Sequence, residues 1–400
     1  MGRGNKEMML NYSLDNLKKR DFILGYLVMI YFSFFSTLYL YLPLIIKNLG
    51  VNNSYIGILG TFYSLGSVLS GFLISPQVDK YKKYTLIFIR IAIIIQSILI
   101  VSLFFSNNLD YYIFSLLLIG LTGAFYIGTC FSLSNNRGIT VSISSIGFLI
   151  GYFLGSVINN YKIMFILIFI LYILGFVFSF LIILKENEIK NKGIENSDDT
   201  NSLKVFVKNI NIYLPLVFRH SGAAMIWLFF TYILLNHYHM DLKAIGILNA
   251  INIIVQTFSN PILAIFAYKI NKRLASFILV SLGYFLSSLY FLLFYFTKDF
   301  HLLFLLQIIL GLSFTALYLG NIEALILNNE KEKVTALSLL SSIMSLSNLI
   351  GSFLGTVIFK FGYEFMFLLA FILAFLAFSF YILSNYKILL DFLKYREEKL

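Results

Sequence analysis

The sequence predicts an all-α membrane protein with twelve transmembrane helices arranged as two similar halves of six. Composition is the first observation: 59% of the 400 residues are hydrophobic and 12% are charged, whereas soluble proteins carry roughly 25% charged residues. A soluble core has no room for this much apolar surface, so lipid must surround most of the chain. The second observation is a series of apolar runs, and the third is an internal repeat.

The apolar runs have the length, about 20 residues, that crosses a bilayer as a helix. They must be helical because a backbone exposed to lipid has to satisfy its own hydrogen bonds. The twelve runs lie at 22–46, 55–75, 84–106, 111–134, 139–159, 162–184, 213–236, 244–268, 274–297, 301–327, 335–359 and 362–386. The chain then divides into an N-terminal segment (1–21), a first half (22–184), a polar linker (185–212), a second half (213–386) and a tail (387–400) that we expect to form a short helix.

The internal repeat is clearest in the fifth and eleventh runs. GYFLGSVI at 151–158 returns as GSFLGTVI at 351–358, with six of eight positions identical. IGIL opens the second run at 56–59 and also the eighth at 245–248. Two six-helix halves in the same orientation are an architecture of secondary transporters, in which the substrate site lies where the halves meet.

Basic residues predict the orientation in the membrane. The formal net charge is +11, and 23 of the 30 Lys and Arg residues fall in the terminal segments, the linker and the even-numbered connections. Five fall in odd-numbered connections, and two, Arg90 and Arg219, lie within runs. Positive residues stay on the cytoplasmic side, so we expect both termini in the cytoplasm and the chain in the plasma membrane. This distribution explains the positive charge without a nucleic-acid partner.

The sequence gives no sign of a cofactor, a metal site or an enzyme. The single cysteine, Cys130, can form neither an intrachain disulfide nor a cysteine metal cluster. His237, His239 and Asp241 follow a predicted span, where we expect an interfacial loop and not a metal site. No P-loop motif is present, which argues against ATP-driven transport. We expect a monomer that binds a small molecule.

The connection after the second run contains a recognisable motif, SPQVDKYKK at 75–83. It resembles the loop signature of the major facilitator superfamily, G-x-x-x-D-[RK]-x-G-[RK]-[RK]. Asp79, Lys80 and Lys83 are kept, while Ser and Lys replace the two glycines. With the duplicated six-helix plan, the likeness to this superfamily covers nearly the whole chain. The resemblance implies the major facilitator fold and a gating role for these three side chains.

The fifth run carries a second motif. Gly138, Gly147, Gly151 and Gly155 match four glycines of G-x8-G-x3-G-P-x2-G-G, with Tyr in place of the proline and Ser in place of the last glycine. This pattern resembles the twelve-span drug/proton antiporter branch and implies a role of these glycines in the conformational change. The arginine that this branch often carries in its fourth span is missing here. The alternative is close packing of small residues, which Gly151 and Gly155 favour because both recur in the eleventh run.

Ionisable residues inside predicted spans are Arg90, Arg219, His220 and Glu323. Such residues are costly in lipid and mark functional sites. The resemblance implies that spans one, four, seven and ten line the cavity, and thus that Arg219, His220 and Glu323 lie there. We expect Glu323 to pair with Arg219 or His220 and to couple protons to transport. The alternative is that Glu323 and Arg219 reach the cytoplasmic interface or only gate it. Arg90 lies in a peripheral span, where we expect it to hold the Asp79 loop.

The other candidates for the substrate pathway are aromatic and polar side chains that share helix faces. Aromatic stripes are also common in packing, and the amides of the eighth span either bind a polar substrate or hold that helix against a neighbour. The candidates are Tyr31 and Phe35 in the first span, Thr122 and Tyr126 in the fourth, Trp227 in the seventh, Asn252 and Gln256 in the eighth, and Tyr318 and Asn321 in the tenth.

These observations favour a secondary transporter that works by alternating access. An aromatic, charge-poor cavity suits apolar ligands and, with the antiporter-like glycines, favours proton-coupled efflux of lipophilic or amphipathic small molecules. Proton symport of a neutral polar metabolite such as a sugar is the alternative that the amides of the eighth span favour. A membrane receptor or scaffold without transport is a third alternative, but a scaffold has no need of buried ionisable residues.

Overall fold

The computed structural model describes residues 19–51, 55–158, 160–182 and 201–397, and all regular structure within these ranges is helical. Eleven helices in these ranges are long and apolar enough to cross a membrane. A further helix, α12 (Ile210–Asn236), has 27 residues and packs lengthwise among them. The all-α membrane fold expected from the sequence is therefore confirmed.

The first half consists of six spans. Two of them contain a π-helical turn: α3 passes through η1 into α4, and α7 passes through η3 into α8. The helices are α2 (Lys19–Asn48), α3 (Tyr55–Leu69), η1 (Ser70–Ile74), α4 (Ser75–Lys80), α5 (Thr85–Phe105), α6 (Leu109–Leu133), α7 (Arg137–Leu149), η3 (Ile150–Leu154), α8 (Gly155–Ile158) and α9 (Tyr161–Ser179).

The second half begins with a short helix, α11, directly before α12. Its last helix continues beyond the expected end of the span at 386 into the tail. The helices after α12 are α13 (Leu242–Lys269), α14 (Lys272–Phe296), α15 (Phe300–Asn328), α16 (Lys333–Ile358) and α17 (Tyr363–Glu397), and α11 is Ser202–Lys208. Most of the expected N-terminal segment (1–18) and much of the expected linker (183–200) lie outside the described residues.

Polar residues in the connections fix where helices begin. Asn160 accepts a hydrogen bond from the backbone N–H of Lys162 at 3.0 Å, and Asn271 accepts one from Arg273 at 3.0 Å. Asn136 caps the start of α7 in the same way. The first N–H groups of a helix have no partner within it, and an asparagine side chain supplies one. Short polar connections therefore set the helix starts.

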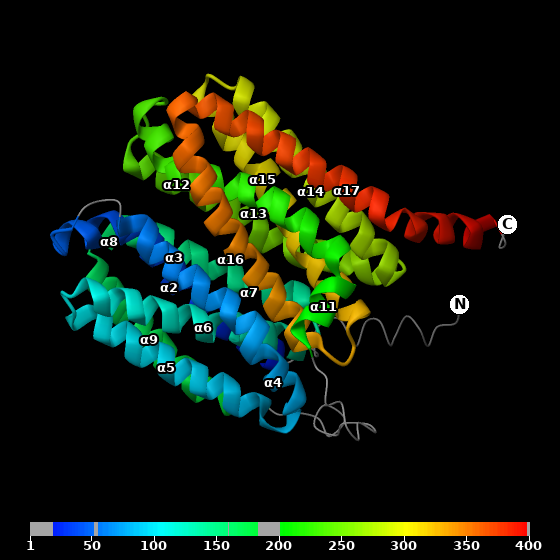
Figure 1. The fold of residues 1–400 in the computed structure, drawn as a ribbon, viewed down its shortest axis with the longest axis horizontal. Helices are drawn as coiled ribbons and strands as arrows, with labels where there is room; N and C mark the ends of the chain where they lie inside the picture. Colours follow the sequence, from blue (N-terminus) through cyan, green and yellow to red (C-terminus); the bar gives the residue numbers. More distant parts are fainter. Residues whose placement is uncertain (1–18, 52–54, 159, 183–200, 398–400) are drawn as a thin grey trace.

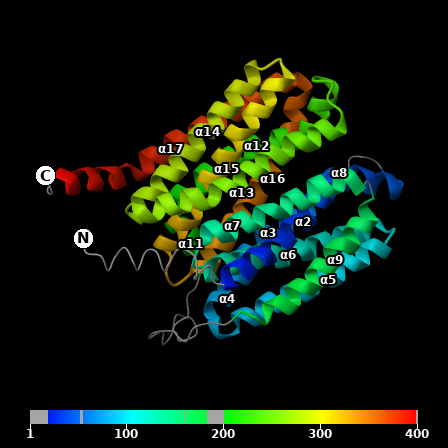
Figure 2. The ribbon, with the colours of Figure 1, turned by 180° about the vertical axis from the view of Figure 1, so that it is seen from behind.

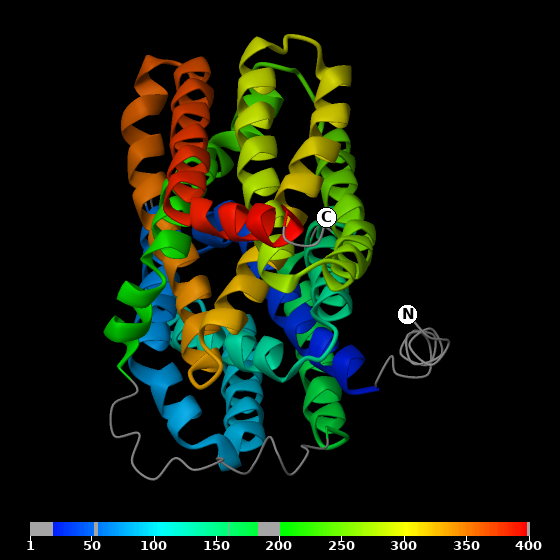
Figure 3. The same ribbon diagram turned by 90° about the vertical axis from the view of Figure 1, so that its right-hand side faces the viewer.

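The two halves are separate bundles that lie side by side. Figure 1 shows α2 to α9 as one bundle and α12 to α17 as the other, and Figure 2 shows the same arrangement from behind. In Figure 3 the second half lies above the first. Helix α17 ends on the same side of the molecule as α4 and α11, while α8 lies on the other side (Figure 1). We call the first side the terminal end and the second the opposite end.

The repeated glycines build the same helix contact in both halves. Gly151 lies against Ser36, so that the fifth span packs closely on α2. Its repeat partner, Gly351, lies against the backbone of α12, so that α16 packs on α12 in the same way. Gly147 and Gly155 also meet α2, one turn to either side of Gly151. A larger side chain at Gly147, Gly151 or Gly351 meets backbone atoms and forces the two helices of a pair apart.

Candidate functional site

An ion pair between Arg137 and Glu323 joins the two halves near the terminal end. Arg137 is the first residue of α7, and Glu323 lies close to the end of α15. Arg137 Nη1 donates to both carboxylate oxygens, at 2.9 Å to Oε1 and 2.8 Å to Oε2. The two side chains are only 14% and 11% exposed. Removing one partner of such a buried pair leaves an unpaired charge and typically costs about 3–5 kcal/mol.

This pairing differs from the one that the sequence led us to expect. The carboxylate of Glu323 is occupied by Arg137, and neither Arg219 nor His220 is its partner. Helical angles place side chains relative to their own helix, so they carry no information about a residue from the other half. One sequence signal does point to Arg137: it directly precedes Gly138, which lets the start of α7 lie against α13 of the second half.

Asp79 holds the start of α16 from across the interface. Its carboxylate accepts hydrogen bonds from the backbone N–H groups of Val334 at 3.2 Å and Thr335 at 2.6 Å. These N–H groups have no partner within α16, and the helix dipole favours a negative charge there. Lys82 adds a second link, from its Nζ to the Lys331 carbonyl oxygen at 2.8 Å. The loop motif therefore contributes directly to the contact between the halves.

Arg90 has a different role from the one expected. Its Nε and Nη2 donate to the side chain and the carbonyl of Ser179, at 3.3 and 3.2 Å. Its guanidinium also lies over the Phe180 ring, 4.1 Å from the centre. Arg90 thus ties α5 to the end of α9 and does not hold the loop after α4, because that loop is bound to α16 instead. Lys80 and Lys83 of the motif are exposed.

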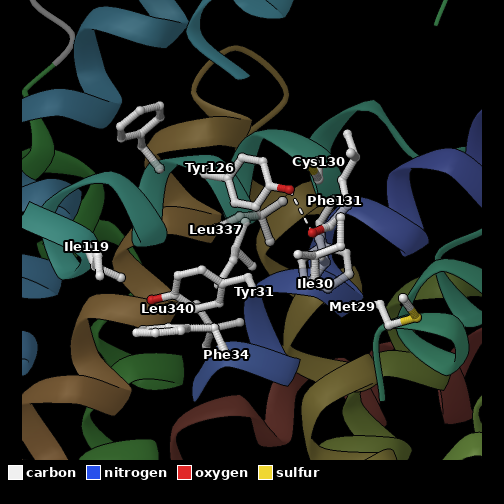
Figure 4. Close-up of a cluster of buried hydrophobic side chains, with 14 of the residues drawn as sticks. Met29, Ile30, Tyr31, Phe34, Ile119, Tyr126, Cys130, Phe131, Leu337 and Leu340 are labelled. Atoms are coloured by element: carbon white, nitrogen blue, oxygen red, sulfur yellow. Dashed lines mark hydrogen bonds between the residues drawn. The ribbon is translucent and has the colours of Figure 1, made fainter. Parts of the chain in front are cut away.

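Serine and apolar contacts complete the closure on the terminal side. Ser342 of α16 donates to the Ser67 carbonyl oxygen of α3 at 2.6 Å. Phe131 of α6 meets Tyr318 of α15 edge to face, with ring centres 5.9 Å apart. Figure 4 shows Leu337 of α16 among buried side chains of α2 and α6. We call these contacts, together with the ion pair and Asp79, the terminal seal.

A small polar cavity lies inside the second half. Arg219, His220 and Asn321 line it with apolar side chains of α12, α15 and α16, and its volume is about 10 Å³. That is roughly the space that one water molecule needs. Arg219 donates from Nε to Ser287 Oγ at 2.8 Å, and its guanidinium lies 6.0 Å from the centre of the Phe314 ring. Tyr284 is a polar neighbour of Asn321, and Asn348 is one of His220. Within the described residues, the Asn321 amide and His220 Nδ1 are buried and make no close hydrogen bond.

Aromatic side chains become exposed beyond this cavity, toward the opposite end. Trp227 lies two turns after His220 on the same face of α12, with the rings 6.5 Å apart. His220 is 2% exposed, whereas Trp227 is 50% exposed. In α2, Tyr39 is 36% exposed and packs on Phe35, whose ring meets that of Phe148 in α7. The seal therefore lies on the terminal side, while Trp227 and Tyr39 are exposed toward the opposite end.

Three candidates of the first half are bonded within their own half. Tyr126 donates to a carbonyl oxygen of α2 at 2.6 Å, and the Tyr31 hydroxyl bonds to a tyrosine of α3. Thr122 accepts from Gln96 Nε2 at 3.0 Å, and Tyr172 donates to Gln96 Oε1 at 2.7 Å. Sequence reasoning missed Gln96 and Tyr172, because one polar residue in an apolar run forms no pattern. This network links α5, α6 and α9 within the first half.

The amides of α13 bond mainly along their own helix. Gln256 Nε2 donates to Asn252 Oδ1 at 2.9 Å, and Asn260 Nδ2 donates to the Gln256 carbonyl oxygen at 2.8 Å. All three side chains are buried. Near Asn260, α13 packs against Gly138 of α7. This arrangement favours helix contact over substrate binding for these amides.

The loop after α12 has local structural contacts. The His237 ring lies 3.8 Å from that of Tyr363, measured between centres. Asp241 starts α13 by accepting from the Ala244 N–H at 2.6 Å. Across the described ranges, no three His, Cys, Asp or Glu side chains lie together as metal ligands would.

Two equivalent helical halves, sealed at one end and enclosing buried charges, define a membrane transporter of the alternating-access type. The family model of the Major Facilitator Superfamily matches residues 23–235 and 212–389. The chain belongs to this superfamily, and it is a transporter and not an enzyme.

Solved structures of transporters share the fold. The human organic anion transporter MFSD10 (TETRAN) superimposes with a TM-score of 0.68 at 13% identity, over 91% of this chain and 99% of that one. A variant of the nucleoside transporter NupG gives a TM-score of 0.65 at 16% identity, over 92% of this chain and 100% of that one. No curated protein matches the chain in a sequence comparison. At these identities the likeness concerns the fold alone.

Proposed function

We propose that the chain is a proton-coupled transporter that exports lipophilic or amphipathic small molecules across the plasma membrane. The observation that carries the proposal is the buried ion pair of Arg137 and Glu323, which places a carboxylate inside the terminal seal. We assign the terminal end to the cytoplasm because most Lys and Arg residues fall in the segments expected there. The structure then corresponds to an outward-facing state.

The charge of Glu323 couples a proton to the opening of the seal. With the carboxylate ionised, Arg137 has a partner and the halves stay together. A proton on Glu323 leaves the Arg137 cation buried without a partner, which is unfavourable in a low-dielectric interior. Separating the halves lets water reach both groups, so protonation from outside favours the inward-facing state. There the proton leaves to the cytoplasm, and substrate moves outward on the return.

The exposed aromatic rings support a lipophilic or amphipathic substrate. Trp227 and Tyr39 are exposed toward the opposite end, one in each half. Phe35 extends the aromatic surface of α2. Apolar walls with a few polar groups are the usual composition of a small-molecule site.

Proton symport of a neutral polar metabolite is the second candidate. The Asn321 amide, which makes no close hydrogen bond, favours it, because a buried polar group calls for a polar partner. The organic anion transporter and the nucleoside transporter named above carry different solutes on one fold, so the fold does not select between these candidates. The same seal serves both, since protonation favours inward opening in either case.

Transport in proteoliposomes with an imposed pH gradient tests the proposal. We expect the wild type to move a lipophilic dye against the proton flow. Glu323→Gln removes the charge, and we expect gradient-driven transport to fall at least tenfold while exchange of dye without a gradient continues. Glu364→Gln is the matched control, because Glu364 is exposed at the start of α17 and lies outside the seal.

Three other outcomes of this transport experiment would lead to different conclusions. Gradient-driven transport that is intact in Glu323→Gln rejects Glu323 as the coupling group. Uptake of a sugar with the proton flow, without dye export, favours the second candidate. A wild type that moves no solute in a panel of dyes, sugars and nucleosides supports a receptor or scaffold.

A further inference from the structure

The small polar cavity has the composition of a subsite for an anion. We infer that Arg219, with Asn321 and His220, binds the anionic group of an amphipathic organic anion whose apolar body lies against Trp227. The inference rests on the proposed transport function. It narrows the substrates from lipophilic or amphipathic molecules in general to those with a carboxylate or a similar oxyanion.

Arg219 is a buried cation without a counter-ion. It is 1% exposed, and a guanidinium stays charged in proteins. Its hydrogen bond goes to the neutral hydroxyl of Ser287, and among the described residues no carboxylate forms an ion pair with it. Arg137, by contrast, has Glu323. The terminal nitrogens of Arg219 therefore present the two-pronged donor that matches a carboxylate.

Two further polar side chains line the same cavity. Asn321 is 1% exposed, and its amide lies beside the buried hydroxyl of Tyr284, but neither group makes a close hydrogen bond in the described part of the chain. His220 is 2% exposed, and its Nδ1 likewise makes no close hydrogen bond. Buried polar groups are nearly always hydrogen-bonded, so these groups point to a polar ligand. None of the residues that line the cavity is acidic, and the site is therefore electropositive.

The size of the cavity indicates when the anion binds. About 10 Å³ is too small for a carboxylate in this state. All the lining residues belong to the second half, so the donors keep their arrangement when the halves move. Tyr318 covers the cavity toward the first half, where it meets Phe131. Separation of the halves removes this contact and opens the subsite.

Trp227 supplies a surface for the rest of the substrate. It lies about 12 Å along α12 from Arg219, at 1.5 Å per residue, and is half exposed. The ring of His220 lies between the two levels and meets Trp227 edge to face. A molecule with an anionic group at one end and an aromatic body at the other spans this distance. Trp227 is also the only tryptophan of the chain, so its fluorescence reports on this position alone.

A matched pair of fluorescent probes tests the inference. Dansylglycine carries a carboxylate, and dansylglycinamide has nearly the same shape without the charge. We titrate each into the purified full-length chain in nanodiscs and measure energy transfer from Trp227 to the dansyl group. We expect dansylglycine to bind at least tenfold more tightly than the amide. Arg219→Gln should abolish this preference, and Arg219→Lys should keep part of it, because the charge remains without the two-pronged geometry.

Arg273→Gln is the matched control, since Arg273 is exposed in the first turn of α14 and should keep the full preference. Equal affinity of the wild type for both probes overturns the inference, whatever the folding of the variants. Dye flux of the same preparation separates this failure from failure of the transport proposal. Gradient-driven dye export with equal probe binding rejects only the anion subsite. Preference for the acid without any flux supports the subsite and rejects the transport proposal.

Discussion

Arg90, Arg137 and Arg219 are compensated in three different ways in this molecule. Arg137 has the carboxylate of Glu323, and Arg90 has Ser179 and an aromatic ring at the edge of the bundle. Arg219 has only a hydroxyl and the face of a ring. A buried charge without a counter-ion lowers the free energy of unfolding. The first two arginines therefore support the fold, while Arg219 is available to a ligand.

Exchanging the charges of Arg137 and Glu323 measures how much their ion pair contributes to the free energy of unfolding. Arg137→Glu and Glu323→Arg each place like charges together in the seal, and we expect each to lower the free energy of unfolding by about 3–5 kcal/mol. The double exchange restores opposite charges and should recover at least half of the combined loss. Melting temperatures of the four proteins in detergent give the coupling energy. Strictly additive losses would show that the two side chains do not depend on each other.

The sequence predicts these charges but not their partners. Arg219, His220 and Glu323 stand out because ionisable residues are rare in lipid. Arg137 lies 186 positions from Glu323, and a one-dimensional pattern relates only residues of the same helix. Arg137 also sits at the border of a span, where a basic residue is ordinary. The ion pair and the cavity beside Arg219 follow from how the halves meet, which composition and periodicity do not encode.

At the scale of helices, the start of α16 depends on a side chain from the other half. Asp79→Asn keeps the shape but removes the negative charge that faces the N–H groups of α16. We expect this change to destabilise the state with the closed terminal end by about 1 kcal/mol. Labelling of a single cysteine by a maleimide measures this. The cysteine replaces Ser142, where α7 meets α13, in a protein that also carries Cys130→Ser. We expect it to react several-fold faster when Asp79→Asn is added.

Asp110→Asn is the control for this measurement. Asp110 is exposed in the first turn of α6, at the opposite end. The substitution Asp110→Asn changes the same chemical group outside the terminal seal, so the cysteine at position 142 should be labelled at the same rate as with Asp110 in place. Faster labelling in both variants, or in neither, would contradict the role assigned to Asp79.

The repeated glycines give a prediction for pairs of helices. Leucine in place of Gly151 or Gly351 meets α2 or α12 directly, and we expect each change to destabilise the protein by about 1–3 kcal/mol through overpacking. Gly60→Leu should have little effect, because no atom lies within 4 Å of a Cβ atom placed at Gly60. Thermal unfolding in detergent compares the three variants. If Gly351→Leu melts like Gly60→Leu, the repeat does not build the contact in the second half.

Helix positions are the part of the fold that the sequence predicts well. The fourth run at 111–134 became α6, Leu109–Leu133, because apolar length fixes a span. The last helix shows the limit: we expected a span that ends at 386 and a short helix in the tail, whereas α17 continues as one helix to Glu397. Helix formation continues into a polar segment without any hydropathy signal, since it depends on backbone propagation and not on burial.

At the scale of the whole molecule, the polar contacts between the halves described above lie on the terminal side, while α13 also packs against α8 toward the opposite end. The ion pair, Asp79 and the serine contacts of α16 all belong to the terminal seal. On the other side, Trp227 and Tyr39 are exposed. Because these polar contacts stabilise only the state with a closed terminal end, any group that weakens the seal favours the alternative state, in which the opposite end closes.

Chemical labelling in oriented vesicles tests this asymmetry and the orientation together. In a Cys130→Ser background, Tyr39→Cys should react with a membrane-impermeant maleimide added outside, because Tyr39 is 36% exposed toward the opposite end. Gln77→Cys, exposed in α4 at the terminal end, should react only in inverted vesicles. Tyr31→Cys is the matched control two turns earlier in α2, and should stay unreacted because Tyr31 is 3% exposed. Reaction of Tyr39→Cys from the cytoplasmic face alone would reverse the assigned orientation, and with it the direction in which protonation drives the cycle.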